Sequence, residues 1–363
     1  MTEQRAGARR LLVVELLGGF GDLLIALPAI HALAAAMPQA TVRVATAPAA
    51  APLLDADPAV DSVVAGDLRR PREWLTEELD AHPPDLVVST TMHSGLDALI
   101  AERVSGSVTN LWRRPPADEL IERRFLHLLA SDGLIDQAQL ATRLQVCLTD
   151  AERDSGRALL HRLLGPAARA PLLALPGSGM AVKRWPEGYW RRLLSRAGRP
   201  SLVPHAERDA APAAVPLPAG LGLRGLAGLA AAVGEAGGSA LGGDTGPVRL
   251  ATAVGCPAVG LYGPTLASRY GLSAPWAQNL QGLPGCEVRR PTAITEQECW
   301  WSARCPLDAQ PARGGVGGAP LGAPLGASLG APHAFGTLPQ CMADVSVDDV
   351  LAALDRVGRW HDE

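Results

Sequence analysis

Lys183 is the only lysine among the 33 Lys and Arg residues of this chain, and its surroundings indicate a phosphate contact. It follows the turn Pro176-Gly177-Ser178-Gly179 and precedes Trp185-Pro186, where a helix is expected to begin. A Gly-rich turn and a cation before a helix commonly bind phosphate, because free backbone N–H groups point at the ligand. A compact ammonium also differs from the planar Arg guanidinium, so a lone Lys suggests a need for that group. Chance retention of a single Lys is the alternative.

Two aspartates stand in similar Gly-containing loops. Asp22 follows Gly18-Gly19-Phe20-Gly21 and is either a helix-capping carboxylate or a general base at the carboxyl end of a parallel strand. Asp244-Thr245-Gly246 opens another helix, so Thr245 and the backbone N–H groups either hold a pyrophosphate or simply cap the helix. Arg249, in the first turn of that helix, opposes the helix dipole unless an anion binds there. The residues alone leave both interpretations open.

These loops require an alternating order of strands and helices. The apolar run Leu11 to Val14, the first Gly-rich loop and the helical periodicity after it predict the opening of a parallel α/β domain. The order restarts after a Pro/Ala-rich joint at 165–171, with a strand at 172–175. Further strands are expected at 42–45, 86–88 and 258–262, and a charged helix at 150–164.

The pattern predicts an α/β protein with two Rossmann-like domains facing across a cleft. We expect an N-terminal domain over residues 1–168 and a C-terminal domain over 169–345, in which 314–336 is a low-complexity loop. A final helix over 346–363 would start at the capping box Ser346-Val347-Asp348-Asp349. Its apolar face would consist of Val350, Leu351, Leu354 and Val357.

Composition excludes several classes of function. The 363 residues are 47% hydrophobic with a net charge of -4, which predicts a globular protein and argues against nucleic acid as a partner. Charged residues and a proline interrupt the apolar stretch 11–36, so we expect neither a transmembrane segment nor a leader, and a cytoplasmic location. Asp55-Ala56-Asp57 precedes Pro58 and is interpreted as turn chemistry, not a metal motif. The first loop also does not complete a G-x-G-x-x-G fingerprint, which argues against a dinucleotide cofactor.

Four cysteines, Cys286, Cys299, Cys305 and Cys341, lie towards the end of the chain. Their spacings fit no standard zinc pattern, so free thiols are expected and no metal. The sequence does not say whether they cluster.

Three blocks together resemble glycosyltransferase family 9, the heptosyltransferase family. The first is Leu17 to Asp22 with Ala26-Leu27-Pro28-Ala29, and the second is Pro176-Gly177-Ser178 with Lys183 to Pro186. The third is Gly243 to Pro247 with Leu250-Ala251, Gly255, Pro257 and Tyr262-Gly263-Pro264-Thr265. They occur in the order and spacing of the family, and the similarity covers most of the chain outside 314–336.

The resemblance implies a GT-B fold and an inverting, metal-independent transfer of a sugar from a nucleoside diphosphate, typically ADP-heptose, without a cofactor. It makes Asp22 the general base that deprotonates an acceptor hydroxyl. The donor would bind to Ser178, Lys183, Asp244, Thr245, Gly246, Arg249 and Thr265. The loop on the acceptor side would contain Gly18, Gly19 and Gly21.

The chain departs from the family pattern at three places. Leu175 and Arg249 stand where the family often has His, and Glu15-Leu16 replaces a basic residue. These changes bear on the donor sugar. We expect a small-molecule natural product or a cell-surface glycan as acceptor. A hexose nucleotide donor, or a nucleotide-sugar-binding protein without turnover, are the alternatives.

Overall fold

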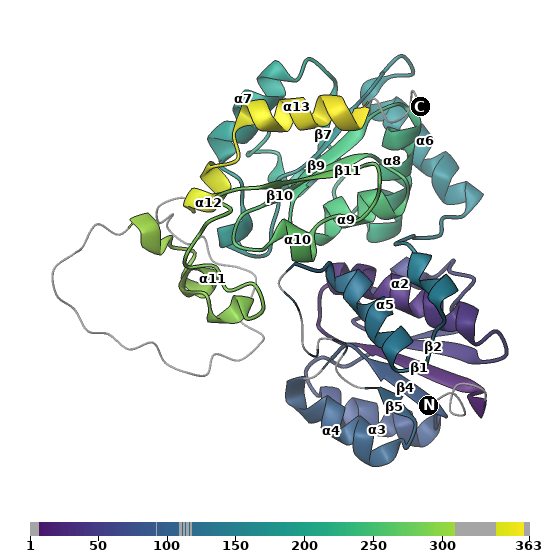
Figure 1. The fold of residues 1–363 in the computed structure, drawn as a ribbon. Coiled ribbons are helices and arrows are strands. Elements are labelled where there is room, and N and C mark those ends of the chain that lie inside the picture. The colour runs from purple at the N-terminus through teal and green to yellow at the C-terminus, as the bar shows by residue number, and fades with distance from the viewer. Residues whose placement is uncertain are drawn as a thin grey trace, which may run out of the picture.

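The structure is a computed structural model that describes residues 7–91, 93–108, 111, 113, 116, 118–308 and 339–358. The described residues form two parallel β-sheets, each covered by helices, and Figure 1 shows the two units one above the other. The α/β class predicted from the sequence is therefore confirmed. The low-complexity loop expected at 314–336 lies outside the described residues.

The first sheet has the strand order β3-β2-β1-β4-β5, and its described strand pairs are all parallel. The central strand β1 is apolar and buried from Leu11 onwards, as expected for a parallel sheet with helices on both faces. Helices α2 and α5 lie on the face towards the second unit, and α3 and α4 on the opposite face (Figure 1). The strands are β1 (Arg10–Glu15), β2 (Thr41–Thr46), β3 (Ser62–Ala65), β4 (Leu86–Ser89) and β5 (Ser107–Val108). The helices are α2 (Phe20–Ala36), α3 (Pro71–Ala81), α4 (Leu96–Arg103) and α5 (Ile121–Ser131).

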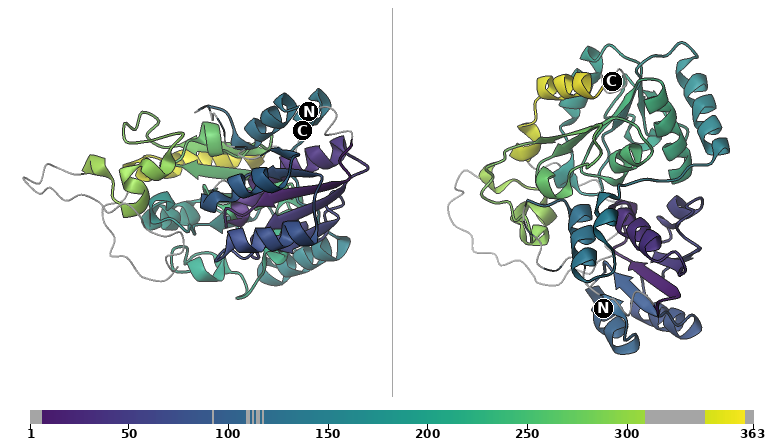
Figure 2. Two further views of the ribbon diagram at one scale, coloured as in Figure 1. Left: turned by 90° about the horizontal axis from the view of Figure 1, so that it is seen from below. Right: turned by 45° about the vertical axis from the view of Figure 1, so that its right-hand side comes forward.

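The second sheet has the order β11-β10-β9-β6-β7-β8, again with parallel pairs. Its strands are β6 (Leu172–Leu175), β7 (Ser201–Val203), β8 (Val215–Pro216), β9 (Ser239–Gly243), β10 (Ala258–Tyr262) and β11 (Ala277–Gln281). Its helices are α7 (Glu187–Arg196), α8 (Leu223–Glu235), α9 (Gly246–Ala253), α10 (Ala267–Tyr270), α11 (Glu298–Ser302), α12 (Gln340–Ala343) and α13 (Val347–Gly358). Helices α9 and α10 lie on the side of this unit that faces the first one (Figure 1), and α9 packs against α2. Figure 2 shows the two units from two further directions.

The Ser346 cap predicted for the last helix is present. The Ser346 hydroxyl accepts the Asp349 N–H at 3.1 Å and donates to the Asp349 carboxylate at 2.6 Å. Val350, Leu354 and Val357 are buried against the second sheet, and Leu351 is half-buried at its edge. Helix α13 thus belongs to the packing of the second unit.

Helix α6 (Asp150–Leu164) falls in the stretch 1–168 that was expected to form the N-terminal domain, but it packs on the second unit. It lies against α8 of the second unit, and a Cβ on Gly156 would come 2.1 Å from the Gly228 carbonyl oxygen. The Val146 N–H also donates to the Ala253 carbonyl at the end of α9. The chain therefore joins the second unit before the Pro/Ala-rich joint, because two glycines let α6 and α8 touch backbone to backbone.

Among the described residues, none of the helices has the length and apolar character needed to cross a membrane.

Candidate active site

Asp22 lies in the first turn of α2, directly after the loop 16–19 that leaves β1. Its N–H donates to the Gly19 carbonyl at 3.0 Å, and its side chain folds back over the same residue. A Cβ on Gly19 would stand 2.9 Å from Asp22 Oδ2, and Gly18 has φ +106°, so both positions favour glycine. The Gly-rich loop thereby brings the Asp22 carboxylate to the carboxyl edge of the first sheet.

The surroundings of Asp22 make it a better base than an ordinary aspartate. Burial raises the pKa of its carboxyl group, and the negative charge of Asp244 acts in the same direction. Lys183, a hydrogen bond with the Gly19 backbone and Arg249 act against this, without reversing it. A carboxylate with a raised pKa accepts a proton more readily at neutral pH.

Lys183 ends a short 3₁₀ turn, η4 (Ala181–Lys183), and forms part of a hydrogen-bonded group at the carboxyl edge of the second sheet. Its Nζ donates to Asp244 Oδ2 at 2.8 Å, and the Thr265 hydroxyl donates to the same oxygen at 2.9 Å. The ammonium also lies 5.0 Å from the ring centroid of Trp300 on α11, which stabilises its charge. The structure thus brings together Lys183, Asp244 and Thr265, three of the predicted donor contacts.

Thr245 and Gly246 stand at the start of α9. The Thr245 hydroxyl makes no capping bond to the helix and instead lies 3.4 Å from the Gly243 carbonyl. The first N–H groups of α9 therefore lack a side-chain cap and can bind an anion.

The amino-terminal ends of α2 and α9 meet at two glycines. A Cβ on Gly21 would stand 3.3 Å from Gly246 Cα, and one on Gly246 would come 2.4 Å from the Phe20 ring. Neither position has room for a side chain. This close approach places Asp22 beside the group that contains Lys183.

Ser178 and Arg249 are placed differently from the other predicted donor residues. The Ser178 hydroxyl accepts the Met180 N–H at 3.2 Å and so shapes its own turn. Arg249 is 4% exposed, and its guanidinium group contacts Glu122 on α5 at 3.4 Å and donates to the carbonyls of Tyr270 and Gly271. The side chain of Arg249, which was predicted as a donor contact, ties the two units together, because Glu122 reaches it from the first one.

Two residues near the site were not singled out in the sequence. Trp300 carries the Lys183 contact described above. Glu207, after β7, packs its carboxylate on Gly177, where a Cβ would stand 2.2 Å from Glu207 Oε1. Its Oε2 is buried and has no hydrogen-bond partner in the described part of the chain, and burial raises the pKa of this carboxyl group. An acidic residue just past a strand at the carboxyl edge of the sheet was the available signal.

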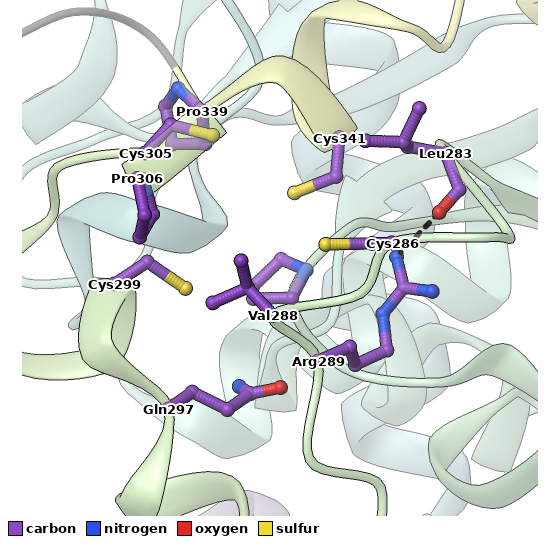
Figure 3. A pocket seen from close by; sticks show the side chains of 11 residues that line it. Leu283, Cys286, Val288, Arg289, Gln297, Cys299, Cys305, Pro306, Pro339 and Cys341 are labelled. Atoms are coloured by element: carbon purple, nitrogen blue, oxygen red, sulfur yellow. Dashed lines mark hydrogen bonds between the residues drawn. The ribbon is translucent and has the colours of Figure 1, made fainter. Parts of the chain in front are cut away.

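The four late cysteines do cluster. Cys286, Cys299, Cys305 and Cys341 line one small cavity, and Figure 3 shows their sulfur atoms around it. All four are free thiols, and burial raises the pKa of Cys341 to about 12. Within the described parts of the chain, His, Cys, Asp and Glu side chains form no group of three that could hold a metal ion as they stand.

Two parallel α/β units whose loops meet at the carboxyl edges of their sheets are the arrangement of the GT-B fold. A family model described as "Glycosyltransferase family 9 (heptosyltransferase)" matches residues 86–293. The chain therefore belongs to glycosyltransferase family 9, the heptosyltransferase family, and is a glycosyltransferase, as the sequence motifs indicated. A search of curated protein sequences finds no match.

Solved structures agree in fold. The ADP-heptose LPS heptosyltransferase II of E. coli is 16% identical, with a TM-score of 0.65, over 98% of this chain and 100% of that one. E. coli heptosyltransferase WaaC, solved with ADP-2-deoxy-2-fluoro heptose, is 20% identical with a TM-score of 0.58, over 79% and 98% of the two chains. The iron-containing dodecameric glycosyltransferase TibC of enterotoxigenic E. coli H10407 is 14% identical with a TM-score of 0.55, over 98% and 77%. At these identities the similarity concerns the fold.

Proposed function

We propose that this protein is a cytoplasmic enzyme that transfers a heptose-like sugar from ADP-heptose to an acceptor hydroxyl, with inversion at the anomeric carbon. One observation carries the proposal: Asp22, with its raised pKa, lies where α2 meets α9, beside the group of Lys183, Asp244 and Thr265. The proposed base, Asp22, lies on the α2 side of the contact between α2 and α9, and Lys183 lies with the uncapped amides on the α9 side. A single displacement needs this arrangement, because a proton is removed on one side while negative charge develops on the other.

In this mechanism the acceptor oxygen attacks the anomeric carbon as its proton passes to the Asp22 carboxylate. The bond between that carbon and the donor phosphate oxygen breaks, and its electron pair stays on the departing diphosphate. Lys183 Nζ and the uncapped N–H groups of α9 stabilise that charge. Attack opposite the leaving group inverts the anomeric configuration. These groups supply the positive potential, so the proposal includes neither a metal ion nor a cofactor.

ADP-heptose is chosen as donor because E. coli heptosyltransferases of the same fold are named for ADP-heptose or were solved with its fluoro analogue. A hexose nucleotide donor would use the same fold and base. Binding of a nucleotide sugar without turnover is the rival from another class.

The acceptor is assigned to the N-terminal unit, because Asp22 and its glycine loop belong to it. We propose a small-molecule natural product or a cell-surface glycan. A transfer assay distinguishes the two kinds of acceptor. Purified acceptors of each kind are incubated with labelled donor, and the transfer of label to each is measured.

Calorimetric titration with ADP, UDP and GDP, beside a Lys183→Ala variant, tests the donor. Tight binding of ADP alone, weakened in the variant, supports the proposal. Binding of UDP or GDP instead would replace the sugar and keep the mechanism, and binding of none would reject the transferase mechanism. Once an acceptor is found, the anomeric coupling constant of the product by NMR tests inversion.

Metal independence has its own test. The transfer rate is measured before and after extensive dialysis against a chelator, with the metal content followed by mass spectrometry. An unchanged rate is expected, since Lys183 and backbone amides meet the diphosphate charge. TibC is described as iron-containing, and the thiol cavity of this chain is the place where iron would be sought. A rate that falls with the metal content and returns on its restoration would overturn metal independence.

A further inference from the structure

Glu15 is a buried carboxyl group that the mechanism above does not use. It is the last residue of β1, the central strand of the first sheet, and is 0% exposed. It stands opposite Thr46 of β2 in the parallel register and directly precedes the loop 16–19 that leads to Asp22. Glu15 thus lies at the start of the loop that leads to the proposed catalytic carboxylate of Asp22.

The carboxyl group of Glu15 is held by uncharged donors. Its Oε1 accepts the Leu17 N–H at 3.0 Å, and its Oε2 lies 3.3 Å from the Thr46 hydroxyl. Next to it, the Thr91 hydroxyl accepts the Leu16 N–H at 2.7 Å. The first two amides of the loop are therefore both bound by buried side chains, and one of these is Glu15.

Several elements contribute charged and polar groups around the carboxyl groups of Glu15 and Asp22. Asp22 of α2 faces Glu15, whereas β2 and the end of β4 contribute the hydroxyls of Thr46 and Thr91. On its other side Asp22 faces Lys183, Asp244 and Arg249 of the second unit. Asp22 thus has cations within reach, whereas the contacts that Glu15 makes with the described residues include none.

Burial and the nearby charge of Asp22 both favour the neutral form of the Glu15 carboxyl group. Burial raises the pKa of Glu15 to about 8, and the charge of Asp22 adds to the effect. At pH 7 most molecules therefore carry a protonated Glu15. A protonated carboxyl group still accepts the Leu17 N–H and can share its own proton with the Thr46 hydroxyl.

We propose that Glu15 is a positioning residue for the transfer: its neutral carboxyl group anchors the loop that carries Asp22 and keeps a second negative charge away from the base. The proposal rests on the function proposed above only for the role of Asp22. When Glu15 ionises, a buried carboxylate without a cation lies beside Asp22, and the repulsion between the two moves the loop away from its active geometry.

The test compares wild type with Glu15→Gln, which keeps the size and the neutral charge. Glu73→Gln serves as the control, because Glu73 is exposed on α3, where it pairs with Arg70. We expect wild-type kcat to fall above pH 8, by roughly tenfold per pH unit if the ionised form is inactive. Glu15→Gln should keep at least a third of the wild-type kcat at pH 7 and lack this decline, while Glu73→Gln should behave as wild type.

A second measurement needs no substrate. The folded pKa of Glu15 lies above its ordinary value of 4.5, so the stability that it contributes is present at low pH and is lost as pH rises from about 4.5 to about 8. The Tm of wild type should therefore fall through this window relative to Glu15→Gln. Wild type and Glu15→Gln with superimposable Tm curves and the same decline of kcat would overturn the proposal. If Asp22→Asn kept full activity, the base would be wrong, but the Tm comparison would still test Glu15.

Discussion

Asp22 and Asp244 occupy equivalent places in the two units and have opposite surroundings. Each follows a central strand at the carboxyl edge of its sheet and stands at the start of a helix. Asp244 is bound by Lys183 at 2.8 Å and by Thr265 at 2.9 Å, whereas burial raises the pKa of Asp22. Two aspartates at the carboxyl edges of their sheets thus suit two purposes: a carboxylate left with a high proton affinity can act as a base, and one paired with a cation can only position it.

The largest expected effect comes from Asp22→Asn. The amide cannot take the acceptor proton, so kcat should fall by roughly 10²- to 10⁴-fold. Donor affinity should change little, because Asp22 makes no hydrogen bond to Lys183. Steady-state kinetics and calorimetry with ADP separate the two quantities.

Asp244→Asn is the matched control for that experiment. It removes the carboxylate that holds Lys183, so donor affinity should weaken together with kcat. Equal losses of kcat and unchanged donor affinity in both variants would show that the two aspartates do not differ in role.

Lys183→Arg is expected to have the next largest effect. A preorganised contact to developing charge is worth about 3 kcal/mol, which corresponds to roughly 100-fold in kcat/KM. Lys183 is 17% exposed and lies between Asp244 and Trp300, and a planar guanidinium has a different shape from a compact ammonium, so we expect Arg to rescue little of the loss seen with Ala. An Arg variant with wild-type kcat/KM would mean that the site needs only a positive charge.

The sequence predicted the strands at 11–14, 42–45, 86–88, 172–175 and 258–262 and the helix that starts near Asp150, because these depend on local patterns that each chain segment carries by itself. Lys183, Asp244 and Thr265 were named together as donor contacts through the resemblance to the family. The sequence did not predict the partners of Arg249, since Glu122 lies 127 positions earlier and approaches only when the two units pack. The sequence also did not predict the contact of Glu207 with Gly177 or the thiol cavity, because their neighbours are distant in the sequence. What brings Glu207 onto Gly177, or Cys341 near Cys286, is tertiary packing.

Glu122→Gln tests that tie between the units. Arg249 would keep its two carbonyl contacts but lose its buried counter-charge, which should lower the free energy of unfolding by about 1–3 kcal/mol. Urea titration measures the change, with exposed Glu73→Gln as the control. An unchanged midpoint would show that the two carbonyls suffice to hold the guanidinium.

The smallest expected effect is on stability, and its sign differs between the two aspartates. Because the folded state raises the pKa of Asp22, the stability that this group contributes is present at low pH and is lost as pH rises through its folded value. Asp22→Asn removes that loss and should stabilise the protein at pH 7 by about 0.5–2 kcal/mol. Asp244→Asn weakens the contacts of Lys183 and Thr265 and should destabilise it. Urea titration of both variants at pH 7 checks the signs. Shifts in the same direction would mean that the surroundings of the two carboxylates are alike, whereas opposite shifts would show that the protein gives up stability at the base.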